Sequence, residues 1–547
     1  MRKHPVLLRL ALLLLCLALL LPQASLAATK KKTAADPSVI RVLLERLNLK
    51  TEAWMTLEGR YAARGADGTE VLLPAGAQVT VLLRKGQLVL FHEGLSFAAG
   101  NSLSLLRRQD GDIEPGIRFN LFSGRYPGDL TLTVQDGVIR PVLTLPLETY
   151  LLGVVPYEMG DSFPLEALKA QAVCARTYAI SKTGSSNEWD VVDNTNDQVY
   201  RGVPDQCENT VQAVEATKGL VLTSGGRLIT AWYSASNGGQ TELPGNIWGG
   251  NNIPDCFVMT DDPWDLNNPS STIRTAVLNK DGSGLSKGFL RLLRQALAGE
   301  QELKQQGLTE EETFRVDAVR SVELTSPRYK KPSRLMTKMV ITLEIAGGEY
   351  TATLDLFPDT VFMLGLSIYG ANNELITVTE EEESFTLTSG RYGHGVGLSQ
   401  RGAQYQASEG KRTYKQILDF YYPGAKLKRY EGEAAPLPTT DPVLAETPGP
   451  KPTATPRPTL MPVTEELPEG AWLGLVSNID ENSTVNLREK PSAGAKVLRR
   501  LYWHQPLIVL EEAEVTGWYR VKTDVIEGYI MASFVQEPEP EEAPGKE

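Results

Sequence analysis

Residues 153–179, GVVPYEMGDSFPLEALKAQAVCARTYA, place one acidic side chain directly before a helix rich in small residues. The acid is Glu158, and its neighbours are valine, proline, tyrosine and methionine. Pro164 suits the first turn of a helix, and Glu166 suits the positive end of the helix dipole. Leucine and alanine recur along one stripe, and alanine allows close packing. The stretch therefore predicts a buried central helix.

Strand and turn patterns surround this helix. Residues 39–144 alternate apolar residues between Gly, Asp and Pro breaks, which predicts a β-rich lobe. Residues 190–260 and 316–380 carry further strands between glycine turns. Residues 285–315 form a charged helical pattern that looks like an insertion, and no function is assigned to it. The fold class is therefore α+β: a β-rich domain with a central buried helix and a cleft.

The composition excludes some classes of partner. A chain of 547 residues is too long for one core. Its net charge is −12, and no dense basic run occurs beyond residues 29–32. This balance argues against nucleic acid as a partner and against adhesion to an anionic cell wall by bulk charge.

The N-terminus predicts export. A basic segment, residues 1–4, precedes an almost wholly apolar run, and Ser25 and Ala27 offer small residues for cleavage. Residues 1–27 are therefore expected to be a secretory signal peptide. An uncleaved anchor is the alternative, so the chain is expected to be secreted or membrane-anchored on the extracytoplasmic side.

Three cysteines follow this segment, which allows one internal disulfide at most. We expect Cys207 to pair with Cys256. Cys174 lies inside the small-residue helix, and we expect it to be a buried small apolar residue.

The C-terminal part divides into three segments. Residues 431–468 are dense in proline, which favours an extended linker over a packed core. Residues 470–536 return to strand spacing and predict a small all-β barrel. Residues 537–547 read as an acidic disordered tail.

The order of five motifs resembles the SpoIID/LytB family, which comprises stage II sporulation protein D and amidase enhancers. The motifs are LPLETYLLGVVPYEMGDSFPLEALKAQAVCARTYAI (145–180), DQVYRG (197–202), ATKGLVL (216–222), SNGGQTE (236–242) and GHGVGLSQRGA (393–403). The resemblance runs through residues 39–430. Residues 485–535, with VNLREKPSAGAKVLRRL, GWYRVKT and EGYIMASFV, resemble a bacterial SH3 domain.

These resemblances imply work on peptidoglycan outside the membrane. Family members resemble lytic transglycosylases that cut glycan strands lacking stem peptides, and some stimulate a partner amidase. The matching catalytic position is Glu158. The implied partners are glycan strands, a cell-wall amidase and, through the SH3 domain, a wall peptide, and no cofactor is implied. A non-catalytic enhancer of an N-acetylmuramoyl-L-alanine amidase is the alternative, and a structural wall protein is a third reading.

The chemistry of Glu158 fits this implication independently. Glycosidases usually use two carboxylates. A lytic transglycosylase can use one, which donates a proton to the leaving oxygen and then accepts one from the muramic C6 hydroxyl. Apolar surroundings would raise the pKa of the carboxyl and favour its proton-bearing form. An exposed loop carboxylate is the competing interpretation.

Other candidate residues are expected to contact substrate. Arg176 would meet the lactyl carboxylate of a peptide-free muramic acid, or would hold Glu158, since a buried cation needs an anionic partner. Gln198 and Tyr200 would hydrogen-bond and stack on sugar, although a core tyrosine is the alternative. Asp197, although a turn former by type, would line the cleft. For Lys169, a functional role competes with a solvated basic flank or a local pair with Glu166.

The loop GHGVGLSQ adds His394, Ser399 and Gln400 as candidate substrate contacts. His394 either hydrogen-bonds sugar or fixes a tight turn in which glycines permit positive φ. A Ser399–His394 nucleophile pair is disfavoured, because both lie in one short glycine loop. Some relatives bind zinc around the SxSxxGG element, but residues 233–239 here carry neither thiol nor imidazole, so no metal is expected.

The SH3-like segment has three aromatic candidates for a binding groove, Trp518, Tyr519 and Tyr529. The alternative for each is a place in the barrel core.

Overall fold

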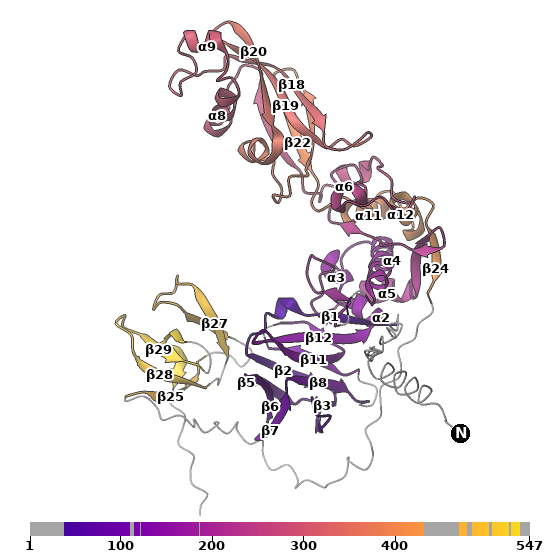
Figure 1. The fold of residues 1–547 in the computed structure, drawn as a ribbon, viewed down its shortest axis with the longest axis vertical. Coiled ribbons are helices and arrows are strands. Elements are labelled where there is room, and N and C mark those ends of the chain that lie inside the picture. Colours follow the sequence, from indigo (N-terminus) through magenta and orange to yellow (C-terminus); the bar gives the residue numbers. More distant parts are fainter. Residues whose placement is uncertain are drawn as a thin grey trace, which may run out of the picture. The chain divides into compact units, whose positions relative to one another are not determined.

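The computed structural model describes residues 38–109, 114–120, 122–184, 186, 188–430, 470–478, 484–502, 506–523 and 527–536. The predicted signal peptide, proline-rich linker and acidic tail lie outside these described residues. The fold is β-rich with interspersed helices, which confirms the predicted α+β class (Figure 1). In the described part of the chain, no helix has the length and apolar character needed to cross a membrane.

The chain separates into two compact units. Among the described residues, the first contains those within 38–46, 124–127 and 142–430, and the second contains those within 47–123, 128–141 and 470–536. The predicted boundaries of a single domain at 39–430 stay a prediction.

The second unit begins with antiparallel strands, as the alternating pattern of residues 39–144 predicts. The strands are β2 (Glu52–Glu58), β3 (Tyr61–Gly65), β4 (Glu70–Leu73), β5 (Gln78–Arg84), β6 (Gln87–His92), β7 (Leu95–Gly100), β8 (Ser102–Arg107), β9 (Gly116–Phe119) and β11 (Asp129–Gln135). They follow the neighbour orders β9-β2-β5-β6-β7 and β11-β8-β3-β4. Buried and less buried residues alternate along β2 and β8, which is typical of half-buried strands.

The C-terminal segment forms its own sheet in the order β27-β26-β30-β29-β28-β25-β31. Its strands are β25 (Trp472–Val476), β26 (Thr484–Arg488), β27 (Val497–Tyr502), β28 (Pro506–Glu512), β29 (Trp518–Lys522), β30 (Glu527–Met531) and β31 (Val535–Gln536). A small apolar core of valine, leucine and isoleucine fills it. This small β-domain agrees with the predicted barrel.

The predicted central helix is α4 (Leu165–Lys182), and thirteen of its residues are buried. It is buried on every side and not only along the predicted stripe. The elements that pack against it are α2 (Leu147–Leu152), α5 (Glu208–Ala216), β14 (Leu220–Ser224), α11 (Gln400–Ser408) and α12 (Tyr414–Tyr421). Its alanines let these elements approach closely.

Short elements complete this part of the first unit. They are β1 (Val39–Leu43), β10 (Arg125–Tyr126), β12 (Val138–Pro146), α3 (Val155–Glu158), β13 (Val191–Val192), β15 (Arg227–Leu228), β16 (Tyr233–Ser234), α6 (Pro244–Trp248), α7 (Pro263–Leu266), β23 (Leu398–Ser399) and β24 (Lys426–Arg429). β1 pairs antiparallel with β12 and parallel with β13. β16 pairs in parallel with β23, which joins Tyr233 to Leu398.

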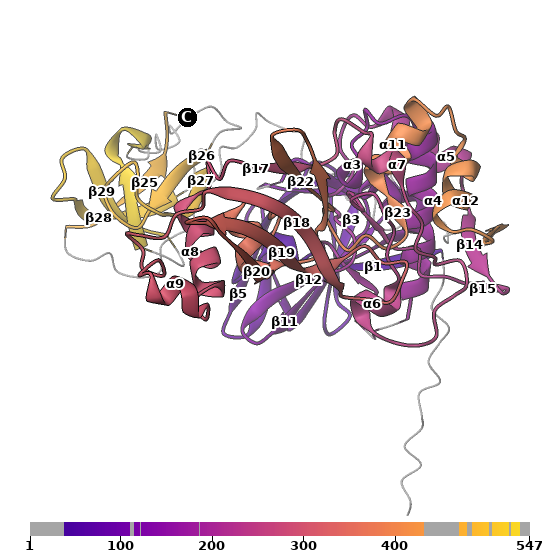
Figure 2. The same ribbon diagram turned by 90° about the horizontal axis from the view of Figure 1, so that it is seen from above.

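A lobe with its own core lies between β16 and β23 in the sequence. It contains β17 (Arg274–Asn279), α8 (Lys287–Ala296), α9 (Gln301–Gln305), β18 (Ala318–Pro327), β19 (Met336–Ile345), β20 (Gly348–Asp355), α10 (Val361–Met363), β21 (Leu375–Glu380) and β22 (Ser384–Gly390). The insertion at 285–315 is helical, as predicted, and Figure 2 shows α8 and α9 beside β20.

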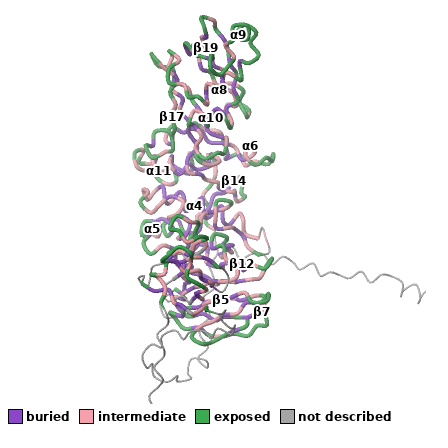
Figure 3. The backbone as a smooth tube through the Cα atoms, turned by 90° about the vertical axis from the view of Figure 1, so that its left-hand side faces the viewer, coloured by how far each residue is buried: buried purple, intermediate pink, exposed green. Residues whose placement is uncertain are grey.

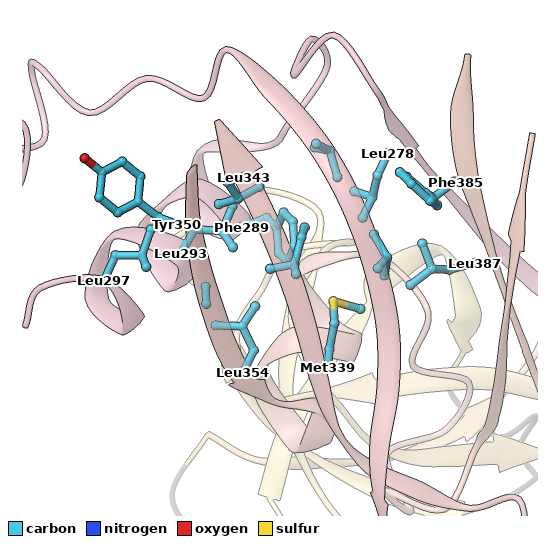
Figure 4. Packing of buried hydrophobic residues seen from close by; sticks show 14 of the residues in the cluster. Leu278, Phe289, Leu293, Leu297, Met339, Leu343, Tyr350, Leu354, Phe385 and Leu387 are labelled. Atoms are coloured by element: carbon cyan, nitrogen blue, oxygen red, sulfur yellow. The ribbon is translucent and has the colours of Figure 1, made fainter. Parts of the chain in front are cut away.

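The insertion belongs to the core of this lobe. Phe289, Leu293 and Leu297 pack with residues of β19 and β20 (Figure 4). α9 is largely exposed, as Figure 3 shows, and Leu303 is its buried residue. The insertion therefore covers one apolar surface of a sheet.

The predicted Cys207–Cys256 disulfide is wrong, because all three described cysteines are free thiols. The Cys207 thiol donates to the carbonyl of Pro204 at 3.8 Å. Cys174 is fully buried in α4, as predicted. Burial raises the pKa of its thiol to about 12, so it behaves as a small apolar side chain.

Candidate functional site

Glu158 is the last residue of α3, a single helical turn held by buried neighbours. Val154 and Val155 are fully buried, and Met159 is nearly so. Gly160 then adopts a φ of +81°, which suits glycine and turns the chain toward α4. The carboxyl is therefore anchored by core residues on both sides in the sequence, while Glu158 itself stays partly exposed.

Three segments that are distant in the sequence donate hydrogen bonds to the Glu158 carboxyl. The Val199 N–H donates to Oε1 at 2.9 Å, and the Gln400 amide donates to Oε2 at 3.2 Å. The Tyr233 side chain also hydrogen-bonds the carboxyl. The fold thus brings DQVYRG, the segment before SNGGQTE and GHGVGLSQ together around one acid.

Burial raises the pKa of Glu158 above that of a free glutamate. The three hydrogen bonds and the nearby Arg201 cation oppose this shift, because they favour the ionised form. The raised pKa agrees with the prediction, and the donors and the cation are features that the sequence did not indicate. Tyr157 lies under the Arg201 guanidinium at 5.4 Å. Phe163 lies under the Arg401 guanidinium at 5.3 Å. Each of these two rings therefore makes a cation–π contact with an arginine.

Gln198 hydrogen-bonds Tyr233 and is too deeply buried to contact a substrate. It is fully buried, and its amide nitrogen donates to the Tyr233 hydroxyl at 2.8 Å. Its amide oxygen accepts from the Tyr150 hydroxyl at 3.2 Å. The predicted direct sugar contact is therefore wrong, and Gln198 instead orients Tyr233. The sequence does not single out Tyr233 as a site residue. It is only the first residue of the stretch 233–239, which lacks zinc ligands.

Arg176 is a scaffold residue. Its side chain is 1% exposed and forms a bidentate pair with Glu148, with Nε–Oε1 at 2.8 Å and Nη2–Oε2 at 2.7 Å. Nη1 also donates to the carbonyl of Leu220 at 3.2 Å. The predicted roles of contacting substrate or holding Glu158 do not fit this buried position. The inference that a buried cation needs an anionic partner was correct, but the partner is Glu148.

Comparison with known proteins agrees with this geometry. Residues 135–224 match the family model described as stage II sporulation protein, SpoIID, and residues 483–536 match the bacterial SH3 domain. The chain contains a SpoIID domain and a bacterial SH3 domain. The SpoIID match includes Glu158, and the predicted resemblance to both families is confirmed.

Curated relatives carry related names. The amidase enhancer of Bacillus subtilis (strain 168) is 34% identical over 51% of this chain, and the chain spans 40% of that protein's length. Stage II sporulation protein D of the same organism is 26% identical over 54% of this chain and 79% of its own length. An uncharacterized protein of Brachyspira hyodysenteriae is 27% identical over 72% of this chain and 94% of its own length.

Within the SpoIID domain, Tyr200 is a core residue, which was the alternative interpretation. It is fully buried and stacks on Tyr150 with ring centroids 5.2 Å apart. Gly153 permits this packing, because an added Cβ there would lie 2.4 Å from the Tyr200 ring. Asp197 accepts from the Tyr178 hydroxyl at 2.8 Å and the Val192 N–H at 2.9 Å. Tyr200 is therefore not placed to bind sugar, and the cleft-lining role of Asp197 stays a prediction.

His394 fixes a tight turn, which was one of the two interpretations left open by the sequence. Its Nδ1 accepts from the Val396 N–H at 3.0 Å, and the ring also hydrogen-bonds the backbone of Tyr233. Burial and the Arg391 cation lower the pKa of His394 to about 4, so the ring is neutral near pH 7. Because these bonds occupy the ring, the predicted sugar hydrogen bond is not supported. The flanking Gly393 and Gly395 have positive φ, as predicted.

Ser399 belongs to a buried polar network. Its hydroxyl donates to Asp265 Oδ2 at 2.6 Å and accepts from the Gly402 N–H at 3.0 Å, which caps α11. Asp265 also accepts from the Ser236 hydroxyl at 2.7 Å and the Asn237 N–H at 2.6 Å. Ser399 therefore positions the helix that begins with Gln400, and it is neither a nucleophile paired with His394 nor a sugar contact.

Gln400 and Lys169 have clear partners. Gln400 was predicted to bind substrate, and the structure places its amide on Glu158 instead. Lys169 pairs with Glu166 at 2.6 Å, which was the local alternative. Among the described residues, no cluster of three or more His, Cys, Asp or Glu side chains is placed to hold a metal ion.

Proposed function

We propose that the SpoIID domain is a lytic transglycosylase that cleaves the bond between N-acetylmuramic acid and N-acetylglucosamine in denuded glycan strands. One observation carries the proposal: Glu158 is a partly exposed residue whose carboxyl has a pKa raised by burial and is held by donors from three segments. A raised pKa favours the proton-bearing form of the carboxyl, which can release its proton to a leaving oxygen.

The reaction needs no second carboxylate. The Glu158 acid protonates the oxygen that leaves with N-acetylglucosamine, and the C6 hydroxyl of the same muramic residue attacks its anomeric carbon. The Glu158 carboxylate then accepts the C6 proton, which closes a 1,6-anhydro ring and restores the acid. The Val199 N–H and the Gln400 amide stabilise the carboxylate between these two transfers.

Arg201 is the cation suited to an anionic substrate in place of Arg176. It is exposed, lies over the Tyr157 ring at 5.4 Å and is electrostatically coupled to Glu158. A muramic acid without its peptide carries a free lactyl carboxylate. Arg201 would attract that carboxylate toward the acid, which would favour denuded strands.

The place of action follows from the second domain. The bacterial SH3 match supports retention at the cell wall, with a wall peptide as its ligand. The proposed protein is therefore an exported enzyme of cell-wall remodelling, with glycan strands as its substrate.

The test uses the full chain and denuded glycan strands prepared by amidase digestion. Mass spectrometry of the wild-type digest should find 1,6-anhydromuramic ends. Glu158→Gln should abolish that product while glycan binding persists, and Glu166→Gln, which removes a helix-end charge, should retain it. Unchanged turnover by Glu158→Gln would refute the acid assignment.

A non-catalytic role is the second candidate, because one relative is named amidase enhancer. In that case the SpoIID domain would hold glycan while a separate amidase cuts the peptide bond. Glycan binding without any anhydro product, together with faster turnover of an added N-acetylmuramoyl-L-alanine amidase, would support this role.

A further inference from the structure

We propose that the exposed face of Trp248 is a binding subsite for one sugar ring of the glycan strand, a role that rests on the proposed function of the Glu158 site. Trp248 ends α6 and is 51% exposed. A tryptophan this exposed leaves a large apolar ring surface in water, where a partner of matching shape can cover it.

The ring of Trp248 is fixed before any ligand arrives. Its inner face stacks on Trp232, with ring centroids 5.0 Å apart and an interplanar angle of 25°. His394 meets it at 5.0 Å and 62°. A ring held on two sides loses little conformational freedom when a ligand binds, which favours affinity.

The backbone keeps the outer face open. Gly249 and Gly250 follow Trp248 with φ of +76° and +94°, and neither has another atom within 4 Å of an added Cβ. These two glycines thus place no side chain beside the ring. The next residues, Asn251 and Asn252, are exposed amides that suit hydroxyl and acetamido groups.

Contacts connect this ring to the Glu158 site. The Tyr233 side chain hydrogen-bonds Glu158, and His394 hydrogen-bonds the Tyr233 backbone. His394 in turn packs against Trp248. The aromatic ring and the acid are therefore linked through Tyr233 and His394 within the first unit.

A sugar ring is the occupant that fits these features. Its C–H face is apolar and flat enough to cover an indole, while its edges carry hydroxyl and acetamido groups for the adjacent amides. An apolar protein partner would not need the asparagines, and an anionic ligand would find no cation among the residues named here.

The experiment measures binding without cleavage. In the full-length Glu158→Gln protein, the dissociation constant for purified denuded glycan strands is determined by calorimetry. Adding Trp248→Ala should weaken binding about tenfold, as expected for loss of an aromatic anchor. Trp248→Phe should recover much of the affinity. Phe362→Ala, which removes another exposed aromatic ring that is 70% exposed, is the matched control and should change nothing.

The outcomes separate this proposal from the proposed function. Unchanged affinity in a folded Trp248→Ala protein overturns the subsite, even if wild type forms anhydro ends. Equal weakening by Phe362→Ala, or no glycan binding by the parent protein, also overturns it. Weaker binding by Trp248→Ala alone supports the subsite even if no anhydro product forms, in which case the domain grips glycan without cutting it.

Discussion

Arg176 and Glu148 face each other as a bidentate pair, with the guanidinium on α4 buried and the carboxylate on α2 29% exposed. Glu148 also accepts from the Gly219 N–H at 3.2 Å. One pair thus joins two helices to the start of β14. Its geometry is the kind that only arginine provides, because lysine cannot make two parallel bonds.

Removing Arg176 should destabilise the protein and not act on substrate selectively. Arg176→Ala removes both guanidinium bonds to Glu148 and the bond to the Leu220 carbonyl, so we expect a loss of about 3–5 kcal/mol in the free energy of unfolding. Urea denaturation measures it. Lys169→Ala, on the same helix but in a more exposed pair, should cost about 1 kcal/mol or less. An Arg176→Ala protein of native stability that fails to bind glycan would restore the substrate role.

Glu158→Gln should stabilise the folded chain near neutral pH. The native state raises the pKa of Glu158, so it binds a proton that the unfolded state has already released. Stability from this group is present below the unfolded pKa and is lost as pH rises through the folded pKa. The variant escapes that loss, so its melting temperature should exceed that of wild type at pH 7. The difference should shrink toward pH 4, and a difference independent of pH would contradict the shift.

Ser399→Ala should weaken the start of α11. The substitution removes a helix cap, worth about 1 kcal/mol, and one hydrogen bond to buried Asp265. We expect a total loss of about 1–3 kcal/mol in chemical denaturation. Ser408→Ala at the other end of the helix should cost about 0.5 kcal/mol or less. Equal costs for both variants would argue against the network.

All three described cysteines should react as thiols. In denaturant without reductant, an alkylating reagent should label Cys174, Cys207 and Cys256 completely, and peptide mass spectrometry reads the result. Without denaturant, Cys174 should stay unlabelled because it is fully buried. Protection of Cys207 and Cys256 together until a reductant is added would reveal a disulfide.

In the SH3 domain, different residues should determine stability and wall binding. Trp518 is buried at the start of β29, so Trp518→Ala should cost about 3–5 kcal/mol in the stability of this domain. Tyr529 is partly exposed, so Tyr529→Ala should weaken retention on purified sacculi with little loss of stability. Deleting residues 470–536 should reduce retention further, and unchanged retention would refute wall binding by this domain.

The secondary structure could be predicted from the sequence because local residue patterns determine it. The alternating strands of residues 39–144 and the buried helix α4 follow from periodicity and small residues. Glu158 was identifiable because an acid in apolar company is unusual. The resemblance to family motifs then indicated which segments accompany Glu158. It did not indicate how the side chains of those segments are oriented.

Side-chain partners were harder to predict because they depend on which residues the fold brings together. Arg176 and Gln198 both lie in matching motifs, yet one pairs with Glu148 and the other with Tyr233. Asp265, which bonds Ser236 and Ser399, carried no local signal at all. A predicted cleft likewise depends on tertiary packing, and it stays a prediction.

The parallel pairing of β16 with β23 has a consequence for biosynthesis. Tyr233 and Gln400 reach Glu158 only when chain segments on either side of a whole lobe have met. That lobe has its own apolar core and can condense while the ribosome is still adding later residues. The acid's surroundings should consequently be among the last features to mature, so a nascent chain would present Glu158 without its hydrogen-bond donors.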